Sequence, residues 1–175
     1  MKKLKNKDLQ RITIAEFKKA EKTPVTIVLD NVRSALNVGS IFRTADAFLI
    51  EEIILCGITA IPPSKEIRKA ALGATDSMHW SYNKSTIDAI NKLKKEGHYI
   101  IAVEQTKKSS KLNKFTINNK PIVIILGNEV NGVAQEIINI CDEVIEIPQF
   151  GTKHSLNIAV TAGIVTWELY KKIKS

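Results

Sequence analysis

Three apolar runs in this chain each end in a loop rich in Gly and Asn, and this layout constrains the fold more than any other feature. The runs are 25–30, 122–126 and 144–147. Short apolar runs of this kind are typical of strands buried on both faces of a parallel sheet. Because the carboxyl ends of parallel strands share one edge of the sheet, we expect the three loops to meet there and form one composite site.

Helices and strands are predicted to alternate along the rest of the chain. Thr13 to Glu16 reads Thr-Ile-Ala-Glu, a capping box that begins a helix expected to reach about Lys22. Alternation of this kind predicts the α/β class, with a parallel sheet flanked by helices. A length of 175 residues fits one such domain, and we place it at 24–175 behind a short basic helical extension at 1–23. The remaining predicted elements are strands at 52–56 and 99–103 and helices at 38–48, 66–72, 85–96, 134–140 and 156–171.

The formal net charge of +8 favours a polyanionic partner, and nucleic acid is the first choice. A proteome that is rich in lysine throughout is the plainer explanation. The distribution of charge favours the first, because segment 1–22 has eight Lys and Arg against three acids. Segment 105–120 has five lysines and no acid, and we interpret it as a mobile basic connection with little core to offer.

Several classes of protein are disfavoured by what the sequence lacks. No apolar run approaches the roughly 18 residues of a membrane span, and no secretory leader is expected at the N-terminus. Cys56 and Cys141 have no metal-ligand spacing, so we interpret them as buried free thiols of a cytoplasmic protein without a metal. There is no Gly-x-Gly-x-x-Gly after the first strand and no Walker A sequence. His154 and Ser155 are adjacent and cannot meet in the geometry of a serine hydrolase.

Individual polar residues in the three loops are open to two interpretations. Arg43 follows the first loop and either holds a phosphate in the cleft or pairs at the surface with Asp46. Glu129 either pairs with a site arginine or substrate hydroxyl, or is a solvated loop acid. Ser155 is either a site residue or a helix N-cap. Asn157 is harder to explain by capping, because it falls inside the first turn of the expected helix.

Taken together, the three segments resemble the three motifs of a known family. In order they are Asn37-Val-Gly-Ser-Ile-Phe-Arg43, Ile125-Leu-Gly-Asn-Glu129-Val-Asn-Gly132 and Ile147-Pro-Gln-Phe-Gly151 continued by Ser155-Leu-Asn157. They resemble the motifs of the SpoU/TrmH family of RNA ribose 2'-O-methyltransferases, which is part of the SPOUT superfamily. The resemblance runs over nearly the whole chain, and the third motif is strong by itself.

The resemblance implies a SPOUT-like α/β fold with a C-terminal trefoil knot, S-adenosylmethionine as the methyl donor, and a homodimer. It also implies that the arginine of one subunit works beside the cofactor of the other. Carried over by motif, the catalytic set is Asn37, Arg43, Glu129, Ser155 and Asn157. The implied cofactor-binding residues are Leu126, Gly127, Ile147, Pro148, Gly151, Ser155 and Leu156.

The function expected from this resemblance is methyl transfer to a ribose 2'-hydroxyl of RNA, with tRNA favoured over rRNA. Two alternatives remain: methylation of a base nitrogen by a related knotted enzyme, and a non-catalytic RNA-binding or ribosome-assembly factor of the same fold. A guanidinium is effectively always protonated, so we expect Arg43 to clamp phosphate and stabilise the developing alkoxide. The predicted RNA-binding residues are Arg11, Arg33, Arg68, Lys69, Lys107 and Lys108.

Overall fold

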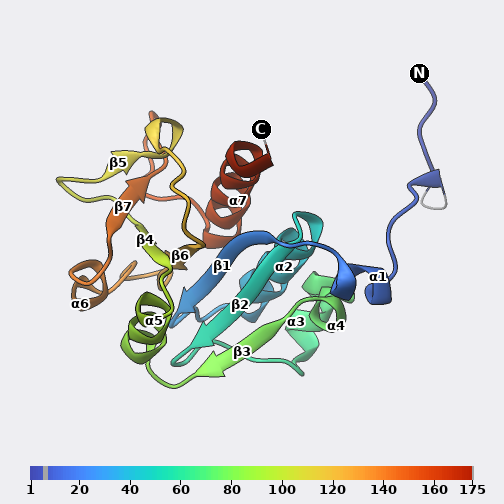
Figure 1. Cartoon of the computed structure of the whole chain (residues 1–175), viewed down its shortest axis with the longest axis horizontal. Helices are drawn as coiled ribbons and strands as arrows, with labels where there is room; N and C mark the ends of the chain where they lie inside the picture. Colours follow the sequence, from blue (N-terminus) through green and yellow to red (C-terminus); the bar gives the residue numbers. More distant parts are fainter. Residues whose placement is uncertain (6–7, 175) are drawn as a thin grey trace.

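A seven-stranded sheet forms the centre of the computed structural model, which describes residues 1–5 and 8–174 (Figure 1). Every pair of neighbouring strands is parallel, and the strand order is β3-β2-β1-β6-β4-β7-β5. β6 therefore lies in the middle, between β1 and β4. The strands are β1 (Thr23–Asp30), β2 (Ile50–Cys56), β3 (Trp80–Asn83), β4 (Tyr99–Val103), β5 (Ser110–Lys111), β6 (Ile122–Leu126) and β7 (Glu143–Glu146).

Helices cover both faces of this sheet, so the chain has three layers (Figure 1). α2, α3, α4 and α7 pack on one face, and α5 and α6 pack on the other. Within the described ranges, none of the helices has the length and apolarity needed to cross a bilayer. The helices are α1 (Ile14–Lys19), α2 (Ala35–Ala47), α3 (Lys65–Ala71), α4 (Ala74–Ser77), α5 (Thr86–Lys95), α6 (Gln135–Ile138) and α7 (Ile158–Lys174), with one 3-10 turn, η2 (Leu112–Lys114).

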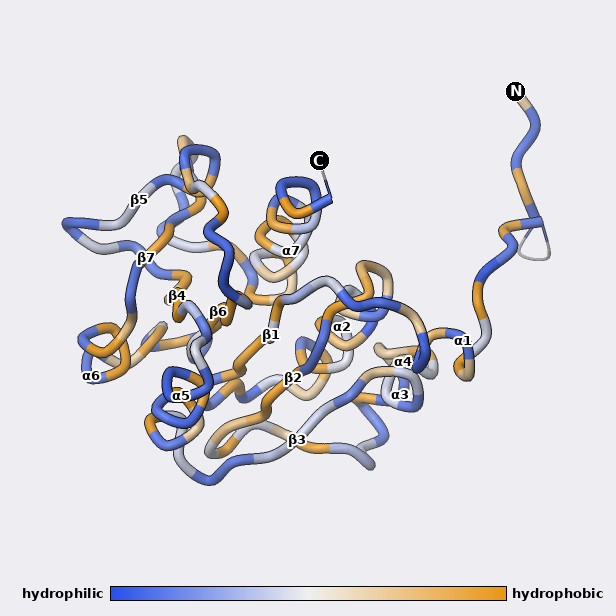
Figure 2. Tube along the Cα trace, in the orientation of Figure 1, coloured by the Kyte–Doolittle hydropathy of each residue, from blue (hydrophilic) through white to orange (hydrophobic). Residues whose placement is uncertain are grey.

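The inner strands are apolar on both sides because each side has its own hydrophobic core. In β1, Ile27 and Leu29 point into the core beneath α2 and α7, whereas Val28 points into the core beneath α5 and α6. β6 alternates in the same way, with Ile124 on the first side and Ile125 on the second. Figure 2 shows apolar residues concentrated along the inner strands, whereas the helices carry both colours. The predicted α/β class with a parallel sheet is confirmed, and the trefoil knot stays a prediction.

The helix of the predicted extension begins at the expected capping box but is shorter than predicted. The Thr13 hydroxyl accepts from the Glu16 N–H at 3.2 Å, and the Glu16 carboxylate accepts from the Thr13 N–H at 2.7 Å. α1 ends at Lys19 rather than near Lys22. The Lys22 ammonium instead donates to the carbonyls of Phe17 and Ala20, where it closes the end of the helix.

The interpretation that segment 105–120 contributes little to the core is wrong. This segment contains the edge strand β5 and η2, and its Leu112 and Phe115 side chains are only 4% and 3% exposed. Both side chains join the core beneath α7. The prediction rested on the five lysines of the segment and overlooked these two apolar residues, which are three positions apart at the start and just after the end of η2.

Candidate active site

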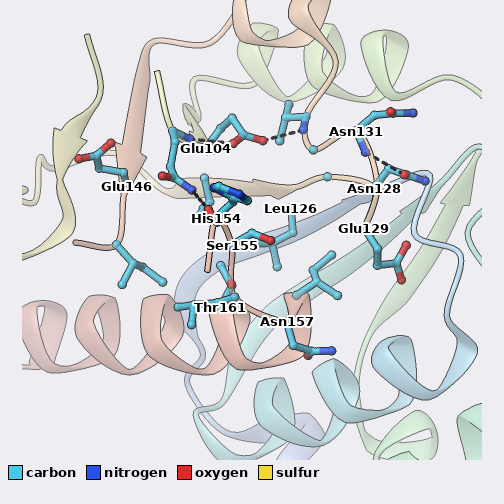
Figure 3. A pocket seen from close by; sticks show the side chains of 18 of the residues that line it. Glu104, Leu126, Asn128, Glu129, Asn131, Glu146, His154, Ser155, Asn157 and Thr161 are labelled. Atoms are coloured by element: carbon cyan, nitrogen blue, oxygen red, sulfur yellow. Dashed lines mark hydrogen bonds between the residues drawn. The ribbon is translucent and has the colours of Figure 1, made fainter. Parts of the chain in front are cut away.

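A cavity of about 640 Å³ opens at the carboxyl ends of β4, β6 and β7 (Figure 3). Its walls come from three segments that are distant in the sequence: 103–105, 126–133 and parts of 146–161. The volume lies within the range of roughly 300–1,000 Å³ that is typical of small-molecule sites. The loops after β6 and β7 meet at one edge, as the sequence predicts, whereas none of the described residues of the loop after β1 lines the cavity.

The topology explains why a cleft forms at this edge. β6 and β7 flank β4, and the helices that follow them, α6 and α7, pack on opposite faces of the sheet. Chains that leave neighbouring strand ends in opposite directions leave a crevice between them, and ligands of open α/β sheets bind there. The Asn128 side-chain amide donates to the Asn31 carbonyl at 2.8 Å and ties the ends of β1 and β6 together.

The loop after β6 is closed by its own hydrogen bonds. The backbones of Asn128 and Gly132 pair in both directions, at 3.0 and 2.8 Å, and the Asn128 side-chain oxygen accepts from the Val130 N–H at 2.8 Å. A Cβ at Gly127 would overlap the backbone of Gly132 and Val133. Gly132 has a φ of +66°, which favours glycine. These two glycines let the loop fold back tightly beside the cavity.

Glu129 is held by backbone groups at the start of α2. Its carboxylate accepts from the Arg33 and Ser34 N–H groups, both at 2.9 Å, and from the Asn37 side-chain amide at 3.2 Å. Partial burial acts to raise the pKa of Glu129, but these hydrogen bonds outweigh it and the pKa lies below its ordinary value of 4.5. Glu129 is therefore ionised at neutral pH. It forms no ion pair with an arginine side chain within the described ranges.

Asn37 connects the three motifs. It lies in the first turn of α2, where its N–H donates to the N-cap Ser34 hydroxyl at 3.3 Å. Its side-chain N–H donates to Glu129, and its side-chain oxygen accepts from the Asn157 side-chain amide at 3.2 Å. One residue from each motif thus joins a single hydrogen-bonded chain, Glu129–Asn37–Asn157, at the rim of the cavity.

Asn157 is the N-cap of α7, which corrects the interpretation of this residue. Its side-chain oxygen accepts from the N–H groups of Ala159 at 2.9 Å and Val160 at 3.3 Å. The helix begins at Ile158, two residues later than predicted, so Asn157 lies before the first turn rather than within it. Ser155 is therefore not the cap. It lies in the exposed loop that lines the cavity, and its hydroxyl makes no hydrogen bond to another described residue.

Most of the predicted cofactor-binding residues lie on the wall of the cavity, and two do not. Pro148 and Gly151 belong to the same loop as Ile147, but neither is part of the cavity wall. Gly151 is exposed. Those that line the cavity are Leu126, Gly127, Ile147, Ser155 and Leu156, together with Glu129 and Asn157.

Arg43 is not part of the cavity. It is exposed on α2, six residues after Asn37, which corresponds to about 9 Å along the helix axis. The predicted alternative of a pair with Asp46 is also not formed, because the Asp46 carboxylate accepts from the Ser77 hydroxyl instead. α2 packs against α7, whose exposed apolar residues include Ile164 and Trp167. Arg43 is thus exposed on the helix that packs beside these apolar residues.

The basic residues predicted to bind RNA are spread over several elements. None of them forms an ion pair with another of the described residues. Arg33 lies one residue before the N-cap of α2, and its backbone contact with Glu129 places it near the rim of the cavity. The six exposed side chains are Arg11, Arg33, Arg68, Lys69, Lys107 and Lys108.

The motifs did not identify several polar residues of the cavity wall. Glu104 and Gln105 directly follow β4 and were assigned to no site, although the argument from strand ends applies to them as well. Glu146, His154 and Thr161 also line the cavity. The wall includes three glutamates and no Lys or Arg. Across the described ranges, no group of three His, Cys, Asp or Glu side chains is placed to hold a metal ion.

Comparisons with known proteins agree with this fold. Residues 24–167 match the SpoU rRNA Methylase family, so the chain belongs to this family and the resemblance of its motifs is confirmed. An "uncharacterized tRNA/rRNA methyltransferase" of Borreliella burgdorferi is 31% identical over 171 residues, which cover 98% of this chain and 73% of that protein. The 23S rRNA (guanosine-2'-O-)-methyltransferase RlmB of Nitrosomonas europaea is 29% identical and is covered over 55% of its length.

Solved structures share the architecture. The rRNA methyltransferase of Sinorhizobium meliloti, solved with AdoMet bound, aligns with a TM-score of 0.82 and 30% identity. That alignment covers 91% of this chain and 61% of the other. The TrmH/SpoU tRNA modifying enzyme of A. aeolicus aligns with a TM-score of 0.81 at 24% identity, which supports the fold alone. The chain spans less than two thirds of several relatives that it matches.

Proposed function

We propose that this protein transfers a methyl group from S-adenosylmethionine to a ribose 2'-hydroxyl of RNA. The hydrogen-bonded chain Glu129–Asn37–Asn157 carries the proposal, because it joins one residue of each motif at the rim of a cavity. None of these three residues belongs to either hydrophobic core. The network is better explained as the support of a reaction site.

The cavity suits S-adenosylmethionine in size and charge. Ile147 and Leu156 offer apolar surface for an adenine ring, and Ser155 is exposed, so its hydroxyl is available for a polar contact. The three glutamates of the wall, with no Lys or Arg among the lining residues, favour a ligand with a net positive charge. When bound, S-adenosylmethionine supplies a methyl group on a positively charged sulfur.

The protein residues would align the hydroxyl and stabilise the charge that develops on it. A ribose hydroxyl is a poor nucleophile at neutral pH, so its orientation and the loss of its proton limit the reaction. The Glu129 carboxylate already accepts three hydrogen bonds, so it fixes the position of Asn37 rather than taking up the proton. Arg43 is assigned to the phosphate beside the target ribose, where its guanidinium stabilises the forming alkoxide.

A homodimer would bring Arg43 to a cavity. α7 exposes Val160, Ile164 and Trp167 at 51%, 38% and 50%, on one stripe of the helix, and the adjacent α2 exposes Leu36 at 50%. An exposed apolar surface of this kind is typical of a protein–protein interface. A second copy packed on α2 and α7 would cover these side chains and place Arg43 beside the partner's cavity. The cavity and Arg43 of one chain then belong to two different sites.

The RNA would be held through its phosphates by exposed basic side chains, in keeping with the net charge of +8. The names of relatives include both tRNA and rRNA, and we favour tRNA as the substrate. Binding through phosphates predicts an affinity that falls steeply between low and moderate salt. We assign the reaction to the cytoplasm, since Cys56 and Cys141 are free thiols.

Transfer of radiolabelled methyl from S-adenosylmethionine to unmodified tRNA and rRNA tests the proposal. Nuclease digestion then separates label on the ribose from label on a base. Label on the ribose of one RNA class is the expected result, and it identifies that class. Label on a base would overturn the 2'-O assignment. A chain that binds the cofactor but labels neither RNA would favour a non-catalytic RNA-binding factor.

A further inference from the structure

The two residues that follow β4 contact both loops of the cavity. β4 lies between β6 and β7 in the sheet, so its carboxyl end emerges between the loops that follow those strands. Glu104 contacts the β6 loop (Figure 3). Gln105 contacts the β7 loop, and both residues line the cavity. We propose that Glu104 and Gln105 are a pair of positioning residues that hold the two loops at the separation needed for S-adenosylmethionine, an inference that rests on the proposed function.

Glu104 fixes the far end of the β6 loop. One carboxylate oxygen accepts from the Val133 N–H at 3.0 Å, and the other accepts from the N–H of Gln105 at 2.8 Å. A Cβ at Gly132 would overlap the Glu104 carboxylate, so the glycine leaves room for this contact. Hydrogen bonds from backbone N–H groups to a carboxylate are stronger than those between neutral groups. The loop is thereby held at Asn128 by Asn31 and at Val133 by Glu104.

Gln105 holds the β7 loop at one point. Its side-chain amide donates to the His154 carbonyl at 2.7 Å. In the described part of the chain, this is the one hydrogen bond that segment 148–156 makes with any other residue. Residues 150–156 are all exposed, so packing gives this segment little support. The position of Ser155 and Leu156 at the cavity therefore depends on Gln105 and on the capped start of α7 at Asn157.

The two contacts make separate predictions for the cofactor-free protein. Glu104→Ala should accelerate amide hydrogen exchange at Val133 and Gln105, and Glu104→Gln should have a smaller effect because its amide oxygen still accepts one N–H. Gln105→Ala should accelerate trypsin cleavage after Lys153, which immediately precedes His154. Each variant should leave the loop held by the other residue unchanged. Matched controls are Glu136→Ala and Gln135→Ala, which are exposed on α6 and should behave as the wild type.

Calorimetric titration with S-adenosylmethionine tests the consequence for binding. Gln105→Ala should raise the Kd about two- to tenfold, the effect of one neutral hydrogen bond. Glu104→Ala should raise it about ten- to a hundredfold, since two bonds to a charged group are lost. For both variants the loss should appear mainly in the KM for S-adenosylmethionine rather than in kcat, because Glu104 and Gln105 hold the loops and do not touch the reacting atoms. Melting temperatures within a few degrees of the wild type show that the variants are folded.

The outcomes separate this inference from the proposed function. Unchanged cofactor affinity in Gln105→Ala and Glu104→Ala would overturn the positioning role. So would loop exchange and cleavage that match the α6 controls, whatever the cofactor result. A wild-type chain that binds no S-adenosylmethionine would instead overturn the proposed function, and the exchange and cleavage measurements would still decide whether the two contacts hold the loops.

Discussion

The Asn157 side-chain amide donates to the Asn37 side-chain oxygen at 3.2 Å, although the two residues are 120 positions apart in the sequence. The same Asn157 oxygen that caps α7 fixes the orientation of this amide. One side chain therefore fixes the start of α7 relative to the first turn of α2. Asn37 in turn donates a hydrogen bond to Glu129, which extends the network to the loop after β6.

Two substitutions of Asn157 separate its two roles. Asn157→Asp keeps an oxygen for the helix cap but loses the donor to Asn37. We expect unchanged stability and a loss of methyl transfer of about tenfold or more. Asn157→Ala loses both and should also lower the free energy of unfolding by about 1 kcal/mol. Urea unfolding and initial rates of transfer measure the two effects. Full activity in Asn157→Asp would show that the contact with Asn37 is not used.

Arg43→Ala should reduce turnover by about 10²-fold, by analogy with the loss of an oxyanion donor. Affinity for S-adenosylmethionine should stay within about twofold, because Arg43 does not line the cavity. Arg43→Lys should recover little of the turnover, since an ammonium lacks the planar fork that binds phosphate at two points. Rates at saturating cofactor and a cofactor titration check both statements. Near-normal turnover of Arg43→Ala would reject the assigned role.

Mixing Arg43→Ala and Asn157→Ala subunits tests whether a site is shared between two chains. Each variant alone should be almost inactive. A mixed dimer has one site with both residues intact, so unfolding and refolding an equal mixture should restore about one quarter of wild-type activity. Activity no higher than that of the separate variants would argue that Arg43 acts within its own chain.

The apolar stripe on α7 predicts the site of association. Ile164→Glu places a charge between Val160 and Trp167 and should raise the dissociation constant of the proposed dimer by at least about tenfold. Ile58→Glu is the matched control, because Ile58 is 68% exposed and lies in the loop after β2 rather than on α2 or α7. Sedimentation over a range of protein concentrations measures both. Equal dissociation constants for the two variants would place the interface elsewhere.

Two Gly→Ala substitutions should have opposite effects. Gly127→Ala forces a methyl group into the backbone of Gly132 and Val133 and should cost about 1–3 kcal/mol of stability, with loss of cofactor binding. Gly163→Ala lies within α7, where an added Cβ meets no atom within 4 Å. It should stabilise the protein by about 0.5–1 kcal/mol. Chemical denaturation compares them, and a stable Gly127→Ala would contradict the close packing of the loop.

The lowered pKa of Glu129 predicts a pH dependence of stability. Because the folded-state pKa lies below the ordinary 4.5, this carboxylate stabilises the protein above about pH 4.5, and the contribution is lost as pH falls through the folded-state value. Glu129→Gln should therefore be less stable than the wild type near pH 7, and the difference should shrink below pH 4.5. Urea midpoints between pH 7 and pH 3 measure it. A difference that is constant with pH would show that the ionisation is not linked to folding.

The sequence predicts the inner elements well because their signals are local. The strand at 99–103 and the strand at 122–126 have the bounds that their apolar runs predict, and the capping box at Thr13 forms as expected. Elements at the edge of the sheet were missed. β3 (Trp80–Asn83) is a half-exposed edge strand with two polar residues, and α4 is a single turn, so neither has an apolar period to recognise.

The sequence predicted several residues of the site but not the hydrogen bonds that join them. Motifs identified Asn37, Glu129 and Asn157, but nothing in their spacing predicts that Asn37 bonds to both of the others. Those bonds span 92 and 120 positions and depend on how β1, β6 and α7 are placed by the whole fold. The N-cap role of Asn157 was missed for a smaller reason, a helix start displaced by two residues. Glu104 and Gln105 could have been predicted from the strand ends, because they directly follow β4.

The order in which the cavity walls occur in the chain has a consequence for synthesis on the ribosome. The residues that line the cavity occur between Val103 and Thr161, and the last of them belong to the first turn of α7. A nascent chain that has completed β6 and β7 still lacks the Asn157 cap and the wall beyond it. Its central strands would remain without the covering helix α7 until the segment beyond β7 has been made. Because the cavity is complete only once α7 has docked, a bound methyl donor would favour the docked state over earlier, incomplete arrangements.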